Sequence, residues 1–565
     1  MHFAALLACI ILAIFGTAFG LSPALHPDAH RTANSPLQHH KPPALFIRLS
    51  KSGVQRIQDF VIDLFEEHMR HAKFTVAGDD SLIWRTLESM DVEIFDLKPA
   101  DRYRIRFEGG YTPGVYMSVE NLGLMIKAKP KIRRGLLLHL LYIPDMVIYA
   151  QMKGIRVSAH FLINFASNVI AQLKVGHCEA AIASLHISVD NAGPLKALLD
   201  SMTTMFNNAV RKKVADKICT IIERLAINRT NKYLSQIQTK RLIFPLPDKD
   251  AANRVRVARQ RTSPNAVGVP RHVRSSSQLD YGQMARNVML DFSIVELPVI
   301  NGDYIETRHS GEVSWQGRGG TPVPLRPSRK AAVRSPNGHS MITCSAHVYV
   351  FNTLIYTLWT KNYFNFVFNR HTTPGMAKFL EIDCETNFEC MGTLLPVLQE
   401  RFSGYYLQIT FRATTAPFVE FHNGLGRMHM AGPLSLEVRR EGRRHTLFRG
   451  KLHVVLAVHL IARNGLIVGN MTLSKFDVHT QNDHEKLMNL NEAKFVAYIW
   501  KAVLETKGNE LLHRGFRLPS LNGIAITHSS LRHVDDAIQI DLDFAIDQSR
   551  IADLATDVMK LVKGA

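Results

Sequence analysis

The stretch LHISVDNAGPLKALLDSMTTMFNNAVRKKVADKIC, residues 185–219, carries the longer of two helical patterns in the first half of the chain. Apolar side chains recur in it three or four positions apart, which is the spacing of one helix face. The pattern predicts a helix from Pro194 to about Leu225. Its apolar residues are Leu195, Leu198, Leu199, Met202, Met205, Phe206 and Ala209.

A second amphipathic pattern lies nearer the start of the chain, with Ser52 as its expected N-cap. Strand-like segments such as VYMSV (115–119) and IRVSAHFL (155–162) lie between the two helices. The first half is therefore predicted to be a helix–strands–helix unit. The apolar face of this first helix consists of Val54, Ile57, Val61, Leu64, Phe65 and Met69.

The second half of the chain repeats this order. A helical stripe is expected to start at Asn352 or Thr353, and alternating strands and a second long helix follow it. The helices start about 143 residues apart in the first half (52 to 195) and about 134 apart in the second (351 to 485), which predicts an internal duplication. The strands are 407–411, 434–438 and 452–460, and the helix is 487–503.

The composition favours two packed domains and an anionic partner. The chain has 565 residues, too many for one ordinary core, and 46% of them are hydrophobic. The formal net charge of +19 favours anionic partners. Two segments rich in Pro, Gly, Ser and Arg, 245–278 and 317–338, are expected to be linkers or exposed loops.

The N-terminal stretch MHFAALLACIILAIFGTAFG, residues 1–20, is a short uncharged apolar run that ends in small residues. This is typical of a secretory signal peptide, although an uncleaved membrane anchor fits the same residues. Export would make the sequons at Asn228 and Asn470 available for glycosylation. It also favours anionic lipid or polysaccharide over nucleic acid as the partner.

The cysteine count predicts at least one thiol that is unpaired or bonded elsewhere. Removal of Cys9 with the signal peptide leaves an odd number in an oxidising compartment. No CxxC motif or Cys/His zinc spacing is present in the sequence, so no metal site is expected. The remaining cysteines are Cys178, Cys219, Cys344, Cys384 and Cys390.

The segment KAKPKIRRGLLLHLLY, residues 127–142, packs five cations into eight residues and then becomes almost wholly apolar. Nucleic acid, an acidic protein and a membrane-like surface are the candidate targets of such a segment. The cations are Lys127, Lys129, Lys131, Arg133 and Arg134.

Several segments together resemble the family of bactericidal/permeability-increasing protein, lipopolysaccharide-binding protein and the cholesteryl ester and phospholipid transfer proteins. Residues 185–219 resemble the strand and long helix of the family's N-terminal domain. The resemblance covers most of the chain in the family's order. Its other segments are PALFIRLSKSGVQ (43–55), VYVFNTLIYTLW (348–359), GTLLPVLQERF (392–402), RGFRLPSL (514–521) and IQIDLDFAI (538–546).

This resemblance implies an α+β fold, an elongated boomerang of two similar domains joined by a central antiparallel sheet. Each domain is expected to be a highly twisted antiparallel sheet wrapped on two helices. The expected divisions are a signal peptide at 1–20, an N-terminal lipid-binding domain at 43–245, linker insertions with central-sheet strands at 246–340, a C-terminal lipid-binding domain at 341–548 and a tail at 549–565.

The resemblance also implies a lipid pocket between helices and sheet in each domain, with bound phospholipid and no other cofactor. Burial of an acyl chain there gains about 0.8 kcal/mol per methylene. The same apolar stripes also suit ordinary core packing. The expected walls are Val54, Ile57, Val61, Leu64, Leu198, Met202, Met205 and Phe206 in the first domain, and Leu354, Ile355, Leu358, Trp359, Phe495 and Ile499 in the second.

Two further features follow from the resemblance. A disulfide joins Cys178 to Cys219, unless Cys219 is simply a buried small residue, and the pairing of the other cysteines stays open. The five cations of the basic segment are expected on a turn around Pro130 at the tip of the N-terminal domain, with 136–142 returning as a strand. That turn either meets acidic lipid head groups or is a solvated turn without a ligand.

The function implied is a secreted, monomeric protein that recognises anionic amphipathic lipids such as bacterial lipopolysaccharide at membrane surfaces, in antibacterial defence. One alternative is an extracellular carrier or transfer protein for phospholipid or neutral lipid. Another is a structural or interaction protein with filled pockets. An enzyme is not expected, because the sequence lacks GxSxG, HExxH and P-loop motifs. Nucleic-acid binding is not expected either, since the Arg-rich segments lack interleaved aromatic residues.

Overall fold

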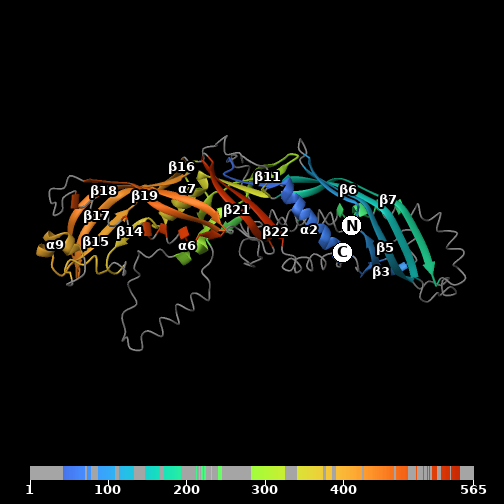
Figure 1. Cartoon of the computed structure of the whole chain (residues 1–565), viewed down its shortest axis with the longest axis horizontal. Helices are drawn as coiled ribbons and strands as arrows, with labels where there is room; N and C mark the ends of the chain where they lie inside the picture. Colours follow the sequence, from blue (N-terminus) through green and yellow to red (C-terminus); the bar gives the residue numbers. More distant parts are fainter. Residues whose placement is uncertain are drawn as a thin grey trace, which may run out of the picture.

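The computed structural model is an elongated molecule with a β-sheet domain at each end and a six-stranded sheet between them (Figure 1). Within the residues that it describes, every helix is too short or too polar to cross a lipid bilayer. These residues are 42–69, 73–77, 87–108, 114–132, 147–165, 171–191, 239–244, 281–324, 340–372, 377–384, 390–422, 425–463, 466–480, 515–517, 524–534 and 536–546, with helical residues at 211–212, 215–216, 218–220, 222–223, 231, 491–492, 501, 505–506, 508–509 and 512–513.

The central sheet combines strands from both halves of the chain. Its order is β10-β11-β1-β13-β22-β21, and every neighbouring pair is antiparallel. Strand β1, the first in the described residues, thus lies beside strands that are about 260 and about 300 residues away in sequence. The strands are β1 (Leu45–Ser50), β10 (Ile294–Ile300), β11 (Tyr304–His309), β13 (Ile342–His347), β21 (Ile524–Val534) and β22 (Ala537–Ile546).

The two halves are related by an internal symmetry. Helix α2 (Lys51–Met69) follows β1 directly, and helix α7 (Val348–Thr360) follows β13 directly. One offset of 297 residues takes the whole of β1 onto β13 and the start of α2 onto the start of α7. The internal duplication predicted from the spacing of the helices is therefore present.

Both helices begin at residues other than the expected caps. The N-cap of α7 is His347, whose Nδ1 accepts a hydrogen bond from the backbone N–H of Tyr349 at 3.1 Å, so the start predicted at Asn352 or Thr353 is wrong. At α2, Ser50 rather than Ser52 accepts from a backbone N–H, that of Gly53, at 3.3 Å. A side chain just before the first turn satisfies an otherwise unpaired donor, and sequence spacing alone did not identify it.

The N-terminal sheet has the order β2-β3-β5-β6-β7, with β4 paired to β5. The strand-like segments 115–119 and 155–162 lie in β5 and β6, as predicted. Described residues between Arg211 and Glu223 are helical, in agreement with the second predicted helix. The strands are β2 (Lys73–Ala77), β3 (Leu87–Lys98), β4 (Arg102–Glu108), β5 (Gly114–Ile132), β6 (Val147–Phe165) and β7 (Ala171–Asp190).

The C-terminal sheet has the order β14-β15-β17-β18-β19-β20, with β16 paired to β17. A small sheet, β12-β9-β8, lies next to helix α6 (Tyr281–Asn287). Helices α8 (Met391–Leu394) and α9 (Pro396–Arg401) match the predicted segment at 392–402. The remaining strands are β8 (Lys240–Leu242), β9 (Val288–Asp291), β12 (Val313–Trp315), β14 (Asn365–Phe368), β15 (Tyr406–Arg412), β16 (Phe418–His422), β17 (Leu425–Arg440), β18 (Arg443–Arg463), β19 (Leu466–Thr480) and β20 (Phe516–Arg517).

Each end domain has its own apolar core. In the N-terminal core, Ile57 of α2 and Ile222 of the second helix belong to the same buried cluster as Phe161 of β6. In the C-terminal core, Phe411 of β15 and Leu436 of β17 are fully buried. Full burial of one such side chain stabilises the fold by roughly 1.5–3 kcal/mol.

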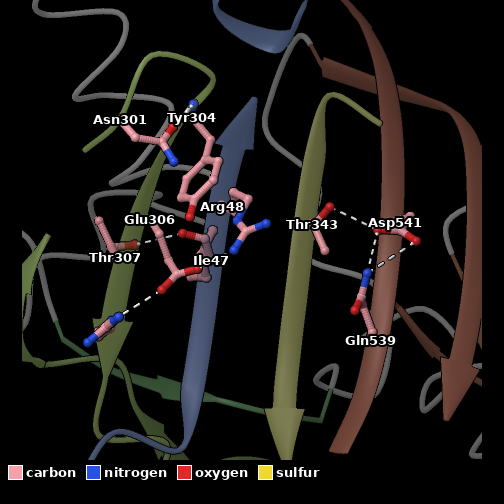
Figure 2. A network of polar contacts seen from close by, with 10 residues as sticks. Ile47, Arg48, Asn301, Tyr304, Glu306, Thr307, Thr343, Gln539 and Asp541 are labelled. Carbon is pink, nitrogen blue, oxygen red and sulfur yellow. Dashed lines mark hydrogen bonds and ion pairs between the residues drawn. The ribbon is translucent and has the colours of Figure 1, made fainter. Parts of the chain in front are cut away.

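A row of buried polar side chains crosses the central sheet (Figure 2). Arg48 of β1 contacts the carboxylate of Glu306 on β11 at 2.8 Å, and both side chains are nearly inaccessible to solvent. On the other side of β1, Thr343 of β13 donates to Asp541 of β22 at 2.8 Å. Gln539 also donates to Asp541, at 3.1 Å. The contact of Arg48 links β1 to β11 and the contact of Thr343 links β13 to β22, so a polar pair lies on each side of the β1–β13 pair that joins the two halves.

Candidate functional site

The expected wall of the N-terminal pocket is only partly within the described residues. Val54 and Ile57 are buried in the N-terminal core. The sheet side of the same cluster includes Val115, Met117 and Val119, which sequence reasoning did not assign to the wall although their alternation in VYMSV indicates one apolar face. The side chains of Val61 and Leu64, and Leu198, Met202, Met205 and Phe206 as a whole, lie outside the described residues.

The expected wall of the C-terminal pocket is divided between two clusters. Leu354 and Leu358 of α7 pack with α6 and the small sheet, whereas Trp359 packs against the C-terminal core. The Trp359 indole N–H donates to the carbonyl of Ala413 at 2.9 Å, which fixes the ring at the edge of the sheet. Ile355 is buried, and Phe495 and Ile499 lie outside the described residues.

Two disulfides stiffen the domains. Cys178 of β7 is bonded to Cys219 of the second helix, as the resemblance implied, with Cα atoms 5.7 Å apart. Cys384 is bonded to Cys390, a pairing that the sequence left open. Cys344 is a free thiol, so the predicted unpaired cysteine lies in the central sheet. The first disulfide holds the second helix against the sheet that it packs on.

The expected basic turn is in fact part of a strand. Pro130 lies inside β5, which continues to Ile132, so the turn predicted around this proline is wrong. Within the described residues, pairing of β5 with β6 ends at Ala128, and β3 is the only strand that lies beside Pro130. A strand with one neighbour tolerates a residue that lacks the backbone N–H. Three of the cations, Lys127, Lys129 and Lys131, lie on this strand, and Arg133, Arg134 and 136–142 lie outside the described residues.

Lys127, Lys129 and Lys131, here called the lysine row, share one face of β5 because alternate residues of a strand point to the same side. Ile126 and Ala128, which alternate with them, pack toward the core. The lysine row therefore lies on the outer face of the N-terminal sheet.

Carboxylates of β3 lie opposite the lysine row. In the register of β3 with β5, Glu93 is opposite Lys127 and Asp91 is opposite Lys129. The ammonium of Lys131 is 3.0 Å from Asp91, and that of Lys73 is 2.9 Å from Glu93. These pairs are largely exposed, so each contributes only about 0–1 kcal/mol to stability. The row keeps cationic character, but part of its charge is neutralised.

An aromatic pair adjoins the lysine row, and sequence reasoning missed it. Phe95 of β3 is 43% exposed, which is unusual for so large an apolar side chain, and its ring meets that of Tyr149 edge to face at 6.1 Å. The Lys127 ammonium lies 5.9 Å from the centre of the Tyr149 ring. The exposed ring of Phe95 and the half-buried ring of Tyr149 lie beside the lysines, so this surface has apolar and cationic groups next to each other. A bulge in β3 after Ile94 shifts Phe95 out of the simple alternation of buried and exposed residues. The alternation in the sequence therefore does not predict that Phe95 is exposed.

The predicted glycosylation sites differ in what the structure describes. Asn470 is exposed on β19, and Thr472, the third residue of its sequon, is exposed on the same face. Asn228 lies outside the described residues. Glycosylation at both positions stays a prediction.

Within the part of the chain that the structure describes, no three His, Cys, Asp or Glu side chains are arranged to hold a metal ion. The chemistry of the lysine row and its aromatic neighbours is that of a binding surface: cations for an anion and rings for an apolar group.

Comparison with known proteins relates the chain to one family. Residues 282–546 match the model described as LBP / BPI / CETP family, C-terminal domain. Nose resistant to fluoxetine protein 5 of Caenorhabditis elegans is 23% identical over 211 residues, which are 35% of this chain and 35% of the worm protein. Bactericidal permeability-increasing protein of Rattus norvegicus is 22% identical over 257 residues, which are 45% of this chain and 52% of the rat protein.

The matched regions thus span about a third and about half of the length of these relatives. Among solved structures, a crystal structure of lipopolysaccharide binding protein aligns with 90% of this chain and 100% of its own, with 14% sequence identity and a TM-score of 0.46.

Proposed function

Because residues 282–546 match the C-terminal domain of the LBP / BPI / CETP family, we propose that the chain belongs to this family and is a lipid-binding protein that engages anionic amphipathic lipids. The observation that carries this proposal is the lysine row of β5 beside the exposed ring of Phe95 and its partner Tyr149. Lysines near an anionic membrane surface each contribute about 1 kcal/mol of attraction, and aromatic rings favour the boundary between water and lipid.

The finer proposal is a secreted monomer that recognises bacterial lipopolysaccharide in antibacterial defence and carries phospholipid in its apolar interiors. The name of the rat relative, bactericidal permeability-increasing protein, supports the defence role. The apolar, uncharged stretch at 1–20 supports export. The proposal involves binding without catalysis, since the sequence lacks the hydrolase, metalloprotease and P-loop motifs.

A second candidate is an extracellular carrier that transfers phospholipid or neutral lipid and only docks to membranes through the lysine row. The carboxylates of Asp91 and Glu93 favour this candidate, because they reduce the charge that the row offers to a head group. The two candidates differ in what the lysines do: they capture the ligand in the first and orient the protein on a membrane in the second.

The test compares two charge-matched triple variants. Lys127→Ser/Lys129→Ser/Lys131→Ser removes the lysine row, and Lys98→Ser/Lys153→Ser/Lys174→Ser removes three exposed lysines elsewhere on the same sheet. The first is expected to weaken lipopolysaccharide binding at least about tenfold, and the second less than about threefold. Intact lipid transfer between neutral vesicles in the first variant, with unchanged lipopolysaccharide binding, would favour the carrier. Equal losses in both variants would show that only net charge matters and would overturn the lysine row as the site.

A further inference from the structure

The far end of the C-terminal domain carries a second cationic surface. Strands β17 and β18 are joined by a two-residue turn, Glu441 and Gly442, which both have positive φ angles of 42° and 85°. This is the backbone conformation of a tight hairpin in which a Gly at the second position is preferred. Four arginines flank the turn, here called the arginine hairpin: Arg439, Arg440, Arg443 and Arg444.

The arginines face one another across the hairpin. Arg440 is paired with Arg443, and Arg439 with Arg444. Like charges directly opposite each other in a sheet are unfavourable. Folding therefore brings positive charges together here, whereas at the lysine row it sets lysines opposite carboxylates.

Neutralisation of the arginine hairpin is incomplete. Arg439 contacts the carboxylate of Glu437 at 2.9 Å. Arg440 donates to a backbone carbonyl, that of Ser403, at 3.4 Å. Arg443 and Arg444 are exposed, and among the described residues no carboxylate lies within ion-pair distance of either guanidinium. Two guanidinium groups are thus available to an external anion.

Helix α9 lies at the same end of the molecule (Figure 1). The hydrogen bond from Arg440 to Ser403 links the hairpin to the residues just after this helix, and the ring of His445 lies 5.5 Å from that of Phe402. Val397 on α9 is 43% exposed, and Arg401 in its last turn is exposed too. Basic and apolar side chains therefore occur together at this end, as they do at the lysine row.

The internal symmetry relates the two surfaces. β5 and β6 lie between β3 and β7, and β17 and β18 lie between β15 and β19. The arginine hairpin, where β17 ends and β18 begins, therefore occupies the place in its sheet that the end of β5 and the start of β6 occupy in theirs. The two surfaces lie at opposite ends of an elongated molecule (Figure 1).

We propose that the arginine hairpin is a second docking site, which binds the phosphate groups of an anionic phospholipid surface. Guanidinium groups suit this ligand, because their planar donors bind phosphate oxygens in pairs. A membrane surface supplies many phosphates at once, which matches a site built from adjacent arginines rather than from one enclosed pocket. The proposal depends on the proposed function only in that both require anionic lipid, and it concerns a different end of the molecule.

The test uses the full-length protein and vesicles of phosphatidylcholine with or without phosphatidylglycerol. Arg443→Ser/Arg444→Ser is expected to weaken binding to the anionic vesicles about 30-fold, since each cation near such a surface contributes about fivefold. The matched control is Arg427→Ser/Arg463→Ser, which removes two exposed arginines from the opposite ends of the same two strands. The control is expected to change binding less than about threefold.

The two proposals fail separately in this experiment. Loss of vesicle binding in the lysine-row variant but not in Arg443→Ser/Arg444→Ser would overturn the second site and leave the proposed function intact. A loss in Arg443→Ser/Arg444→Ser with normal binding in the lysine-row variant would support the second site alone. If Arg443→Ser/Arg444→Ser lost affinity only for a sulfated polysaccharide and kept its affinity for anionic vesicles, the ligand would not be a lipid surface and the inference would be wrong.

Discussion

Ile47 and Cys344 lie opposite each other in the antiparallel strands β1 and β13, and the offset of 297 residues that relates the two halves takes one onto the other. A local two-fold axis therefore passes through this pair. The chain repeats its strand–helix unit around the axis, so the two end domains project in opposite directions from one shared sheet (Figure 1). This arrangement gives an elongated protein two separate ends that can each meet a surface.

The thiol of Cys344 is expected to be unreactive in the folded protein. Loss of solvent around it, and secondarily the nearby carboxylate of Asp541, raise its pKa to about 12. The thiolate is the reactive form, so alkylation by iodoacetamide at pH 8.5 should be at least about a hundredfold slower in the native protein than in the denatured chain. Mass spectrometry of the labelled peptides measures this, and equal rates in both states would contradict it.

Arg48 is expected to be essential to stability only as long as Glu306 is present. Both side chains are nearly inaccessible, and the guanidinium also lies 3.8 Å from the centre of the Tyr304 ring (Figure 2). Arg48→Met leaves the buried carboxylate of Glu306 with Arg308 as its only cation among the described residues, which should lower the free energy of unfolding by roughly 3 kcal/mol. Arg48→Met/Glu306→Leu should cost much less. Urea denaturation distinguishes the two, and additive losses would contradict the coupling.

His309 is expected to make the protein less stable in mild acid. Its burial lowers its pKa to about 4, because the charged imidazolium would lose its solvent. As pH falls from about 6.5 toward 4, the unfolded chain binds a proton that the folded protein does not, so the stability contributed by His309 is present above pH 6.5 and lost below it. The difference in unfolding free energy between pH 7 and pH 4.5 should shrink by about 2 kcal/mol in His309→Gln. If His309→Gln lost as much unfolding free energy between pH 7 and pH 4.5 as the unmodified protein does, groups other than His309 would cause the acid sensitivity.

The two disulfides should differ in their effect on stability. Cys178 and Cys219 are separated by 41 residues and Cys384 and Cys390 by 6, so the first closes the longer loop. In the chain-entropy model, Cys178→Ala/Cys219→Ala should cost roughly 4 kcal/mol and Cys384→Ala/Cys390→Ala roughly 2 kcal/mol. Thermal unfolding of the two variants tests the order. If removal of the Cys384–Cys390 disulfide lowered stability more than removal of Cys178–Cys219, local packing around α8 would contribute more to stability than loop closure does.

Much of the fold was predictable from periodicity. Alternation in 115–119 and 434–438 identified strands, and the repeated order of helices identified the duplication, because a sheet with one buried face requires a period of two. The helix starts were not predictable in this way. The cap at His347 is a side chain that sequence rules seldom select, and its role depends on the turn that follows β13.

The candidate sites were only partly predictable. The lysines form a charge run that the sequence shows directly, but the sequence predicts a turn at Pro130. It carries no signal that, among the described strands, β5 has β3 as its single neighbour there. The carboxylates that face the lysines come from β3, and that register is set by tertiary pairing. The arginine hairpin did have a local signal: Glu441 and Gly442 lie between alternating strands, which is a hairpin pattern.

The measurement that tests the central claim most directly is organic extraction of the purified protein with its disulfides intact, followed by mass spectrometry of the lipid and its molar ratio to protein. Lipid binding in both end domains predicts one or two phospholipid-like molecules per chain. A folded, disulfide-intact sample that yields no lipid would contradict the claim, and the lysine row and arginine hairpin would then remain surface contacts of a protein that carries no lipid.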